Sequence, residues 1–277
     1  MLNIEAIVGP DTRQAMLARV HRYTGIVMAE RKWTLLHGRL RRRVQELQLR
    51  NYEEYLAVLD GSKDEVARFI DLVTTNETSF FRTTRVWQYL TDSFFPDWQR
   101  ANAGKTMNIW SAAASTGEEA YSLAMTAEEF RLKHRDFRYR ILATDIAQGV
   151  LDVGAAGVYR GRNAEGLKNS RQDMLEKYFE FGDNAYRASP SLRNNITFRQ
   201  HNLYQGLAGA DRFDLVLLRN VLIYFDETGQ EAVVEAVRRS MAPNAVLVIG
   251  ESESLHRIRS GLTFQQPLIY RNAGPAP

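Results

Sequence analysis

One stretch, residues 108–122, restricts the possible folds of this chain more than any other. Ile109 and Trp110 suit a buried strand, and the sequence after Gly117 is typical of a helix. Between them, residues 112–115 are all small and leave little side-chain volume at the turn. Such a turn lets a ligand come close to the backbone and to the amides at the helix start. An ordinary strand-to-helix turn of an α/β protein explains the same residues equally well.

Composition excludes several classes of site. The turn after residue 111 is not a G-x-G-x-x-G loop, and no phosphate-loop lysine follows its glycine. The chain has 277 residues and no cysteine, which excludes disulfides and thiolate metal sites and indicates a reducing compartment. Its five histidines are far apart, so we expect no metal site. No apolar run is as long as a membrane span, and no signal peptide is evident, so we expect neither membrane insertion nor secretion.

Predicted strands and helices alternate from residue 107 onward. This alternation indicates an α/β fold with a doubly wound, mostly parallel sheet and helices on both faces. The last pair of strands, 263–264 and 268–270, is expected to add to the sheet edge in antiparallel fashion. The other predicted strands are 107–112, 139–144, 195–198, 213–218 and 245–250, and the predicted helices are 118–131, 147–155 and 227–241.

The alternation is interrupted between residues 157 and 199. Residues 178–188 predict a β-hairpin, with Gly182, Asp183 and Asn184 at its turn. We therefore expect an inserted antiparallel β-subdomain at about residues 158–199. The sheet domain that carries this insertion is assigned to residues 91–277.

The first part of the chain, residues 1–90, is expected to form a small all-helical domain with a linker. Its first 50 residues hold ten Lys and Arg against four Asp and Glu, so the basic charge is concentrated there. In the predicted helix 30–49, apolar residues recur every three or four positions and form one stripe. A solvated helix face explains the basic residues beside this stripe. Few acids are interleaved with them, however, which favours an anionic partner. The arginines concerned are Arg39, Arg42, Arg43 and Arg50.

Residues 74–82 join the two predicted domains and are rich in threonine, with two phenylalanines and one arginine. They suit either a capping segment before the helix 84–90 or a ligand-facing junction between the domains. Asp145 ends a predicted strand and comes 28 residues after Gly117. It suits either the hydroxyls of a ribose or the N-cap of the following helix.

Polar residues also follow two other strands, at the edge where open α/β sheets bind ligands. The amide of Asn202 suits the edge of a base, and the apolar Leu203 suits its face. Arg219 and Asn220 come directly after a buried run. Because buried polar groups need hydrogen-bond partners, these two side chains must meet either a ligand or other protein groups.

Three blocks of this sequence carry a specific resemblance. They are NETSFFR at 76–82, WSAAASTGEE at 110–119 and RNVLIYFD at 219–226. In order and spacing they resemble the signature blocks of the CheR family, the chemotaxis-receptor glutamate O-methyltransferases. The resemblance covers nearly the whole chain, including the basic helical N-terminus.

The resemblance implies a Rossmann-like methyltransferase fold and S-adenosylmethionine as the cofactor, with S-adenosylhomocysteine as the product. Arg82 is expected to act at the methionine end and to orient the incoming carboxylate. Tyr224 is expected to lie close to the methyl group that is transferred. The full set of cofactor-binding residues that the resemblance implies is Asn76, Thr78, Arg82, Ala113, Glu119, Asp145, Ile146, Asn202, Leu203, Arg219 and Asn220.

The resemblance also implies the substrate, a glutamate of a receptor's cytoplasmic methylation helices. The implied product is a γ-glutamyl methyl ester, formed for sensory adaptation by a cytoplasmic, monomeric enzyme that is recruited to membrane receptors. The basic helix, with Arg39, Arg42, Arg43 and Arg50, would then contact the acidic receptor region. The hairpin turn Gly182–Ala185 is shorter than in relatives that bind a receptor's C-terminal pentapeptide, so we expect no tight binding of such a peptide.

Two other functions fit parts of the sequence. A nucleic-acid methyltransferase would also use a basic helical appendage. This chain, however, lacks the Asn/Asp-Pro-Pro-aromatic block of amino-methylating enzymes, and its basic segment lacks interleaved aromatics for base stacking, so we expect no nucleic-acid partner. A signalling module that binds the cofactor without turnover is the second alternative.

Overall fold

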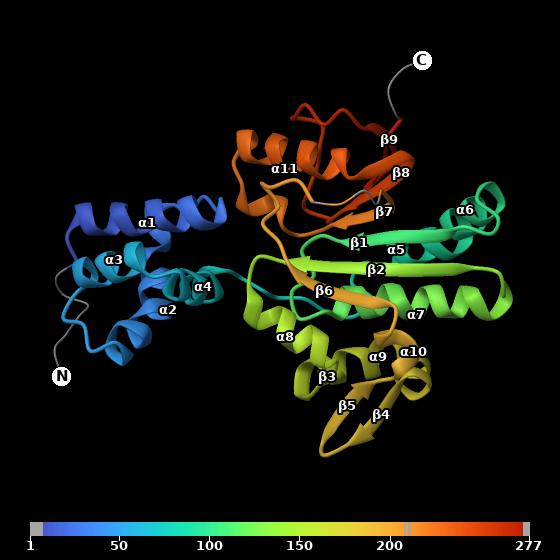
Figure 1. Ribbon diagram of the computed structural model, residues 1–277, viewed down its shortest axis with the longest axis horizontal. Helices are drawn as coiled ribbons and strands as arrows, with labels where there is room; N and C mark the ends of the chain where they lie inside the picture. Colours follow the sequence, from blue (N-terminus) through green and yellow to red (C-terminus); the bar gives the residue numbers. More distant parts are fainter. Residues whose placement is uncertain (1–7, 208, 210–211, 274–277) are drawn as a thin grey trace.

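The computed structural model describes residues 8–207, 209 and 212–273 (Figure 1). Its main sheet has seven strands in the order β6-β2-β1-β7-β8-β10-β9. Neighbours from β6 to β8 pair in parallel, whereas β10 pairs antiparallel with both β8 and β9. The predicted parallel sheet with an antiparallel edge is therefore confirmed. The strands are β1 Thr106–Ser111, β2 Arg138–Asp145, β6 Ile196–Gln200, β7 Phe213–Leu218, β8 Met241–Ile249, β9 Thr263–Gln266 and β10 Ile269–Arg271.

The centre of the sheet is buried on both faces. All side chains from Leu215 to Leu218 on β7 are inaccessible to solvent, as expected for a strand that helices cover on both sides. No described helix is both long and apolar enough to cross a membrane. The helices of this part are α5 Thr84–Tyr89, α6 Phe95–Ala101, α7 Glu118–Lys133, α8 Gln148–Ala156 and α11 Glu227–Arg239, with a π-helical segment, η3 Leu90–Phe94, between α5 and α6.

The N-terminal helices form a separate lobe that lies beside the carboxyl end of β2 (Figure 1). Its own core includes Met16, Leu36, Leu59 and Phe69. This core ends at Val73, and the core of the sheet begins at Phe80 and already includes residues of α5. The boundary therefore lies earlier than residue 90. The helices are α1 Pro10–Thr24, η2 Glu30–Lys32, α2 Trp33–Glu46, α3 Tyr52–Gly61 and α4 Lys63–Val73.

A close contact fixes the lobe against the sheet domain. The ring of Tyr204 fills the space beside Gly25, where a Cβ atom would lie only 2.0 Å from it. Gly25 also has a φ of 73°, which favours glycine. The N–H of Val27 donates to the carbonyl of Tyr224 at 2.9 Å. The chain after α1 thus meets the sheet domain through backbone contacts that leave no room for a side chain at residue 25.

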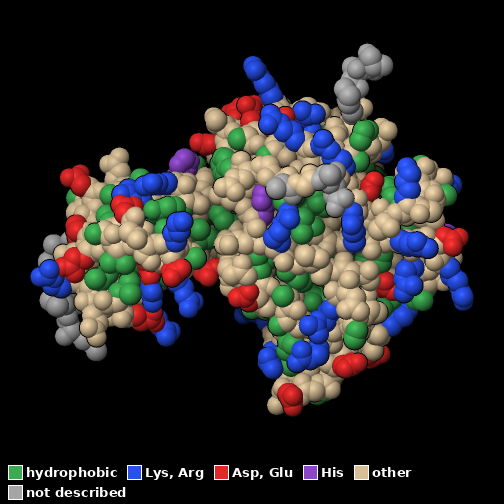
Figure 2. Space-filling view, viewed as in Figure 1, with side chains coloured by type: hydrophobic (Ala, Val, Ile, Leu, Met, Phe, Trp, Pro, Cys, Tyr) green, Lys and Arg blue, Asp and Glu red, His purple; other side chains and the backbone are tan. Residues whose placement is uncertain are grey.

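Two of the basic side chains on α2 have partners within the lobe that the sequence pattern does not show. The guanidinium of Arg43 donates to the buried carboxylate of Glu65 at 2.6 Å, and Tyr55 donates to the same carboxylate at 2.9 Å. Arg39 donates to backbone carbonyls at the end of α4. Arg39 and Arg43 thus already bind carbonyls and an acid from a neighbouring helix, which the pattern of the helix itself does not show. Figure 2 shows Lys and Arg side chains beside Asp and Glu on the visible face of this lobe.

The inserted subdomain contains a three-stranded antiparallel sheet, in the order β3-β5-β4, together with a helix that the sequence analysis does not predict. The helix has non-helical backbone at Arg171, with φ −149°, which interrupts its periodicity. Asp183 and Asn184 both have positive φ, as in a two-residue type I′ turn. Residues 196–199, expected in the insertion, belong to β6 of the main sheet. The elements are β3 Val158–Tyr159, α9 Gly161–Tyr178, β4 Phe179–Gly182, β5 Ala185–Ala188 and α10 Pro190–Arg193.

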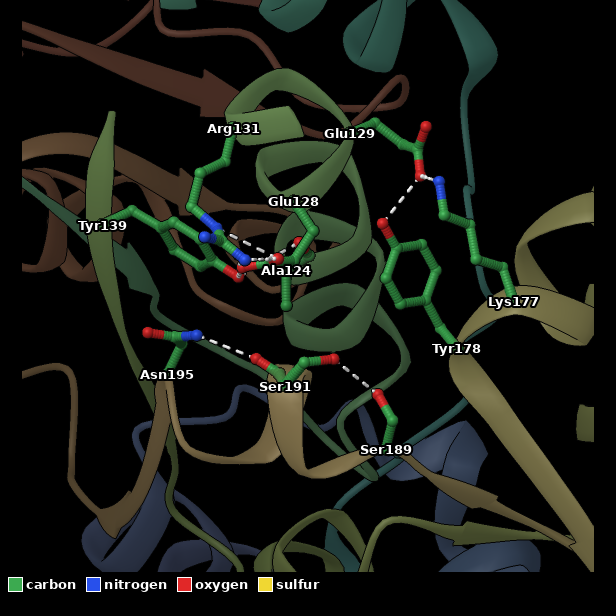
Figure 3. A network of polar contacts seen from close by, with 10 residues as sticks. All are labelled: Ala124, Glu128, Glu129, Arg131, Tyr139, Lys177, Tyr178, Ser189, Ser191 and Asn195. Carbon is green, nitrogen blue, oxygen red and sulfur yellow. Dashed lines mark hydrogen bonds and ion pairs between the residues drawn. The ribbon is translucent and has the colours of Figure 1, made fainter. Parts of the chain in front are cut away.

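Polar contacts fasten this subdomain to α7 (Figure 3). The carboxylate of Glu129 on α7 accepts hydrogen bonds from Lys177 and Tyr178 of α9, both at 2.6 Å. The preceding residue of α7, Glu128, accepts from Tyr139 of β2 at 2.8 Å. The C-terminal half of helix α7 is thus joined to both the main sheet and the insertion.

Candidate active site

A cavity of about 900 Å³, counting the space at its open mouth, lies beyond the carboxyl ends of β1, β2, β6 and β7. Residues of the helical lobe, Thr24 and Ile26, complete its wall. The structure brings all the site residues named from the cofactor motifs to this one cavity. They are Asn76, Thr78, Arg82, Ala113, Glu119, Asp145, Ile146, Asn202, Leu203, Arg219, Asn220 and Tyr224.

The turn between β1 and α7 forms one side of the cavity and is held from two directions. The N–H of Ala112 donates to Leu217 of β7, and that of Ala114 donates to Thr144 of β2, both at 2.8 Å. Gly117 has a φ of 93°, and a Cβ atom there would lie 3.0 Å from the backbone of Gly154. Packing therefore requires a glycine at residue 117, whereas the small residues Ala112, Ala113 and Ser115 line the cavity.

Asp145 is buried at the end of β2, beside this turn. One of its carboxylate oxygens accepts from the N–H of Ser115 at 2.9 Å, and the other accepts from Ala147 at 3.1 Å. Burial raises the pKa of Asp145, while these backbone donors act in the opposite direction. Helix α8 begins at Gln148 and has no side-chain cap, so the alternative role of Asp145 as its N-cap is not realised. Both oxygens keep further lone pairs for a ligand.

A buried ion pair crosses the cavity wall. Arg219 donates to Glu119 at 3.0 Å, and the other oxygen of Glu119 accepts from Ser111 at 2.8 Å. The same guanidinium donates to the backbone carbonyl of Arg82 at 2.9 Å. Its Nε atom is buried without a partner among the described residues. The partners that Arg219 needs are thus mostly protein groups, and they fix the backbone of Arg82 next to the cavity.

Glu253 is a site residue that the sequence analysis misses. Its carboxylate accepts from four backbone N–H groups, those of Asn220, Val221, Leu222 and Gly250, at 2.6–2.9 Å. Burial raises the pKa of Glu253, and these four donors oppose that shift. The carboxylate holds the segment after β7 in place, including Asn220 with its φ of 58°. Only its position a few residues beyond β8, at the same sheet edge, could have indicated it.

Arg82 and Tyr224 lie on the cavity wall. The Arg82 backbone is fixed because Trp87 donates to its carbonyl at 3.1 Å and because Phe81 and Thr83 on either side have positive φ. Its guanidinium is exposed and makes no hydrogen bond or ion pair with another described residue. Tyr224 ends the 3₁₀ turn η4 Leu222–Tyr224 and is half-buried. The site therefore presents a phenol and a positive charge that no described residue pairs, on a backbone held in place.

The other end of the cavity suits a flat aromatic group. Asn202 accepts from the N–H of Tyr204 with its side-chain oxygen, at 3.0 Å, and its amide N–H₂ makes no hydrogen bond to another described residue. Leu203 is buried beside it. His201, also on the wall, is half-buried, and this burial lowers its pKa. No group of three or more His, Asp or Glu in the described part of the chain is placed to hold a metal ion.

Comparison with known proteins explains this arrangement. Residues 76–266 match the family model described as "CheR methyltransferase, SAM binding domain", and residues 12–74 match "CheR methyltransferase, all-alpha domain". The chain belongs to the CheR methyltransferase family. It is 37% identical to chemotaxis protein methyltransferase 2 of Pseudomonas aeruginosa over 264 residues, which cover 92% of each chain. It is 33% identical to the chemotaxis protein methyltransferase of Escherichia coli over 258 residues, which cover 91% of this chain and 87% of that one.

The cofactor of this CheR protein is S-adenosylmethionine, and the cavity fits it. Asp145 offers free carboxylate lone pairs where a ribose would lie, and Asn202 offers an unused N–H₂ group at the flat end. The roles of the single residues toward the cofactor stay predictions, as does the catalytic role of Arg82 and Tyr224.

The position of Glu253 generates a prediction. In Glu253→Gln the amide N–H₂ replaces one acceptor oxygen, so that two backbone N–H groups lose their partner. We expect the free energy of unfolding in urea to fall by about 2 kcal/mol. We also expect the affinity for S-adenosylhomocysteine in calorimetry to fall about tenfold, because the segment 219–222 loosens. Glu251→Gln, at an exposed neighbour paired with Arg85, is the control. Equal behaviour of the two variants would contradict this role.

Proposed function

We propose that this protein transfers a methyl group from S-adenosylmethionine to glutamate side chains of chemoreceptors and so forms γ-glutamyl methyl esters. The names of its relatives, chemotaxis protein methyltransferases, support a role in chemotaxis. The observation that carries the choice of a carboxylate substrate is the unpaired guanidinium of Arg82 on the wall of the cofactor cavity. A guanidinium there attracts a carboxylate, and two of its N–H groups can bind both carboxylate oxygens in one orientation.

The reaction needs no general base. A glutamate carboxylate, with a pKa of about 4.3, is already ionised at neutral pH. When bound, the cofactor supplies a methyl group on a positively charged sulfur. One carboxylate oxygen forms the new C–O bond with its own electron pair while the C–S bond breaks, so no proton moves. The protein's part is to orient the carboxylate through Arg82 and to exclude water from it, with Tyr224 bounding the methyl-transfer site.

Tritium-labelled cofactor and membranes that carry chemoreceptors test this function. We expect labelled receptors that release methanol in mild base, as esters do. Arg82→Ala should lower kcat about 100-fold because the carboxylate loses its orientation, and Tyr224→Phe should lower it less. Arg85→Ala, an exposed arginine in the next helix, is the matched control. Base-stable label would favour methylation of nitrogen, and no label at all would favour a module that binds the cofactor without turnover.

We also propose that the receptor's acidic methylation helices dock on α2 and on the turn that follows it. Arg42 and Arg50 are the arginines most available for direct contact, since their side chains are 88% and 84% exposed and pair only with nearby glutamates. Arg39 and Arg43, expected on the same surface, already bind groups within the lobe. We therefore assign them to holding the docking helix in place. The enzyme would act as a monomer in the cytoplasm, recruited to membrane receptors.

Charge reversal tests this docking surface. We expect Arg42→Glu with Arg50→Glu to weaken receptor methylation, with the effect on KM and strongest at low salt. Calorimetry should find the affinity for S-adenosylhomocysteine unchanged, because neither side chain touches the cavity. Arg100→Glu, at an exposed arginine on α6 that also pairs locally, serves as control. Methylation at the wild-type rate by the double variant would exclude this surface.

The inserted subdomain carries a further proposal. Its hairpin turn has only two central residues, Asp183 and Asn184, between the paired Gly182 and Ala185. A turn this short offers little backbone to a receptor's C-terminal pentapeptide, so we propose that no such peptide is bound tightly. We expect calorimetry to find no binding in the micromolar range, with S-adenosylhomocysteine binding in the same sample as the positive control. A micromolar dissociation constant would overturn the proposal.

A further inference from the structure

Arg39 lies on α2, yet its guanidinium reaches the end of a different helix. One terminal nitrogen donates to the carbonyls of Val73 at 2.7 Å and Thr74 at 3.0 Å, and the other donates to the hydroxyl of Thr75 at 3.0 Å. These groups form the C-terminus of α4, where free carbonyls and the helix dipole favour a cation. Thr74 and Thr75 also line the cofactor cavity. Arg39 thus joins the proposed docking helix directly to the cavity wall.

Hydrogen bonds continue from this point to the buried acid of the site. The hydroxyl of Thr74 accepts from the amide of Asn76 at 3.1 Å. The carbonyl of Asn76 accepts from the hydroxyl of Ser115 at 2.7 Å, and the N–H of Ser115 donates to Asp145 at 2.9 Å. The chain of contacts therefore runs from α2, through the linker between the domains, to the carboxylate expected to bind the ribose.

A second contact joins α4 to the far side of that acid. Asp71, in the last turn of α4, accepts from the N–H of Gly149 in the first turn of α8, at 3.2 Å. A Cβ atom at Gly149 would lie 3.3 Å from the same carboxylate, so the two helices approach closely. Because α8 follows Asp145 directly, the end of α4 is bonded on both sides of the acid. A shift of α4 would change the shape of the cavity.

The neighbouring arginines of α2 provide a contrast. Arg42 donates to Glu46 on its own helix, and Arg43 donates to Glu65 inside the lobe. Neither contact involves a residue of the cavity wall. Arg39 therefore connects α2 to the cavity wall, whereas Arg42 and Arg43 do not. All three were expected on one basic surface.

We propose that Arg39 is a positioning residue that couples the docking surface on α2 to the cofactor cavity, so that cofactor binding and receptor docking favour the same placement of α4. The docking half rests on the function proposed above, and the cofactor half does not. By thermodynamic linkage, a receptor segment bound on α2 then tightens cofactor binding, and the cofactor tightens receptor binding by the same factor.

Calorimetry with S-adenosylhomocysteine alone tests the cofactor half. We expect Arg39→Gln to weaken binding about fivefold or more, in the range typical of coupled sites. Arg39→Lys should recover most of the affinity, because an ammonium can donate to the same carbonyls at the end of α4. Arg42→Gln should bind like the wild type. Thermal melts of all three variants identify any loss of folding. Wild-type affinity in Arg39→Gln, or no recovery in Arg39→Lys, would overturn the proposal.

The coupling half is tested by repeating the titration with a soluble coiled-coil fragment of a receptor methylation region at saturating concentration. We expect the fragment to tighten S-adenosylhomocysteine binding in the wild type and to have no such effect in Arg39→Gln. An equal effect in both proteins, or none in the wild type, would overturn it. Failure of the proposed function is a different result, since it would appear as absence of base-labile label on receptors with the wild-type enzyme.

Discussion

The close packing of the turn after β1 determines how the rest of the molecule can be arranged. Its amides bond to β7 and β2, and Gly117 lies against the backbone of Gly154. Both appendages reach this same turn. The linker of the helical lobe contacts it through Ser115, and Tyr159 of the insertion donates to the carbonyl of Thr116 at 2.8 Å. The turn is therefore the point at which the sheet, the linker of the helical lobe and the insertion are all joined beside the cofactor cavity.

Buried carboxylates hold the residues around the cavity in one geometry. Glu119 is balanced by Arg219, whereas Glu253 is satisfied by backbone N–H groups alone. Glu118 is fully buried at the start of α7 and accepts from Thr116 and from Asn163 of the insertion. Burial raises the pKa of Glu118. Removing one partner of such a group leaves its desolvation cost uncompensated, so each acid ties its neighbours to one geometry.

Sequence reasoning predicts the sheet well because its strands are long buried runs and its helices have regular starts. Strand β7 is found with the same ends, 213–218, and Asp145, Asn202 and Arg219 emerge because they follow strands. The place of Tyr224 is implied only by the family resemblance. Sequence reasoning fails where the hydrogen-bond partner of a side chain or backbone group is distant in the chain. Glu65 lies 22 residues from Arg43, and Glu253 lies 33 from Asn220, so neither pairing leaves a local pattern. Helix α9 is missed because the break at Arg171 divides it.

The contact between Gly25 and Tyr204 has a consequence for how this architecture can diversify. A ring from the catalytic half occupies the volume that any side chain at residue 25 would need. A lobe taken from another protein would have to bring a glycine to this position, or the recipient would have to give up its tyrosine. The two halves can therefore not be exchanged as independent parts. Residue 25 of the helical lobe and residue 204 of the sheet domain must therefore change together.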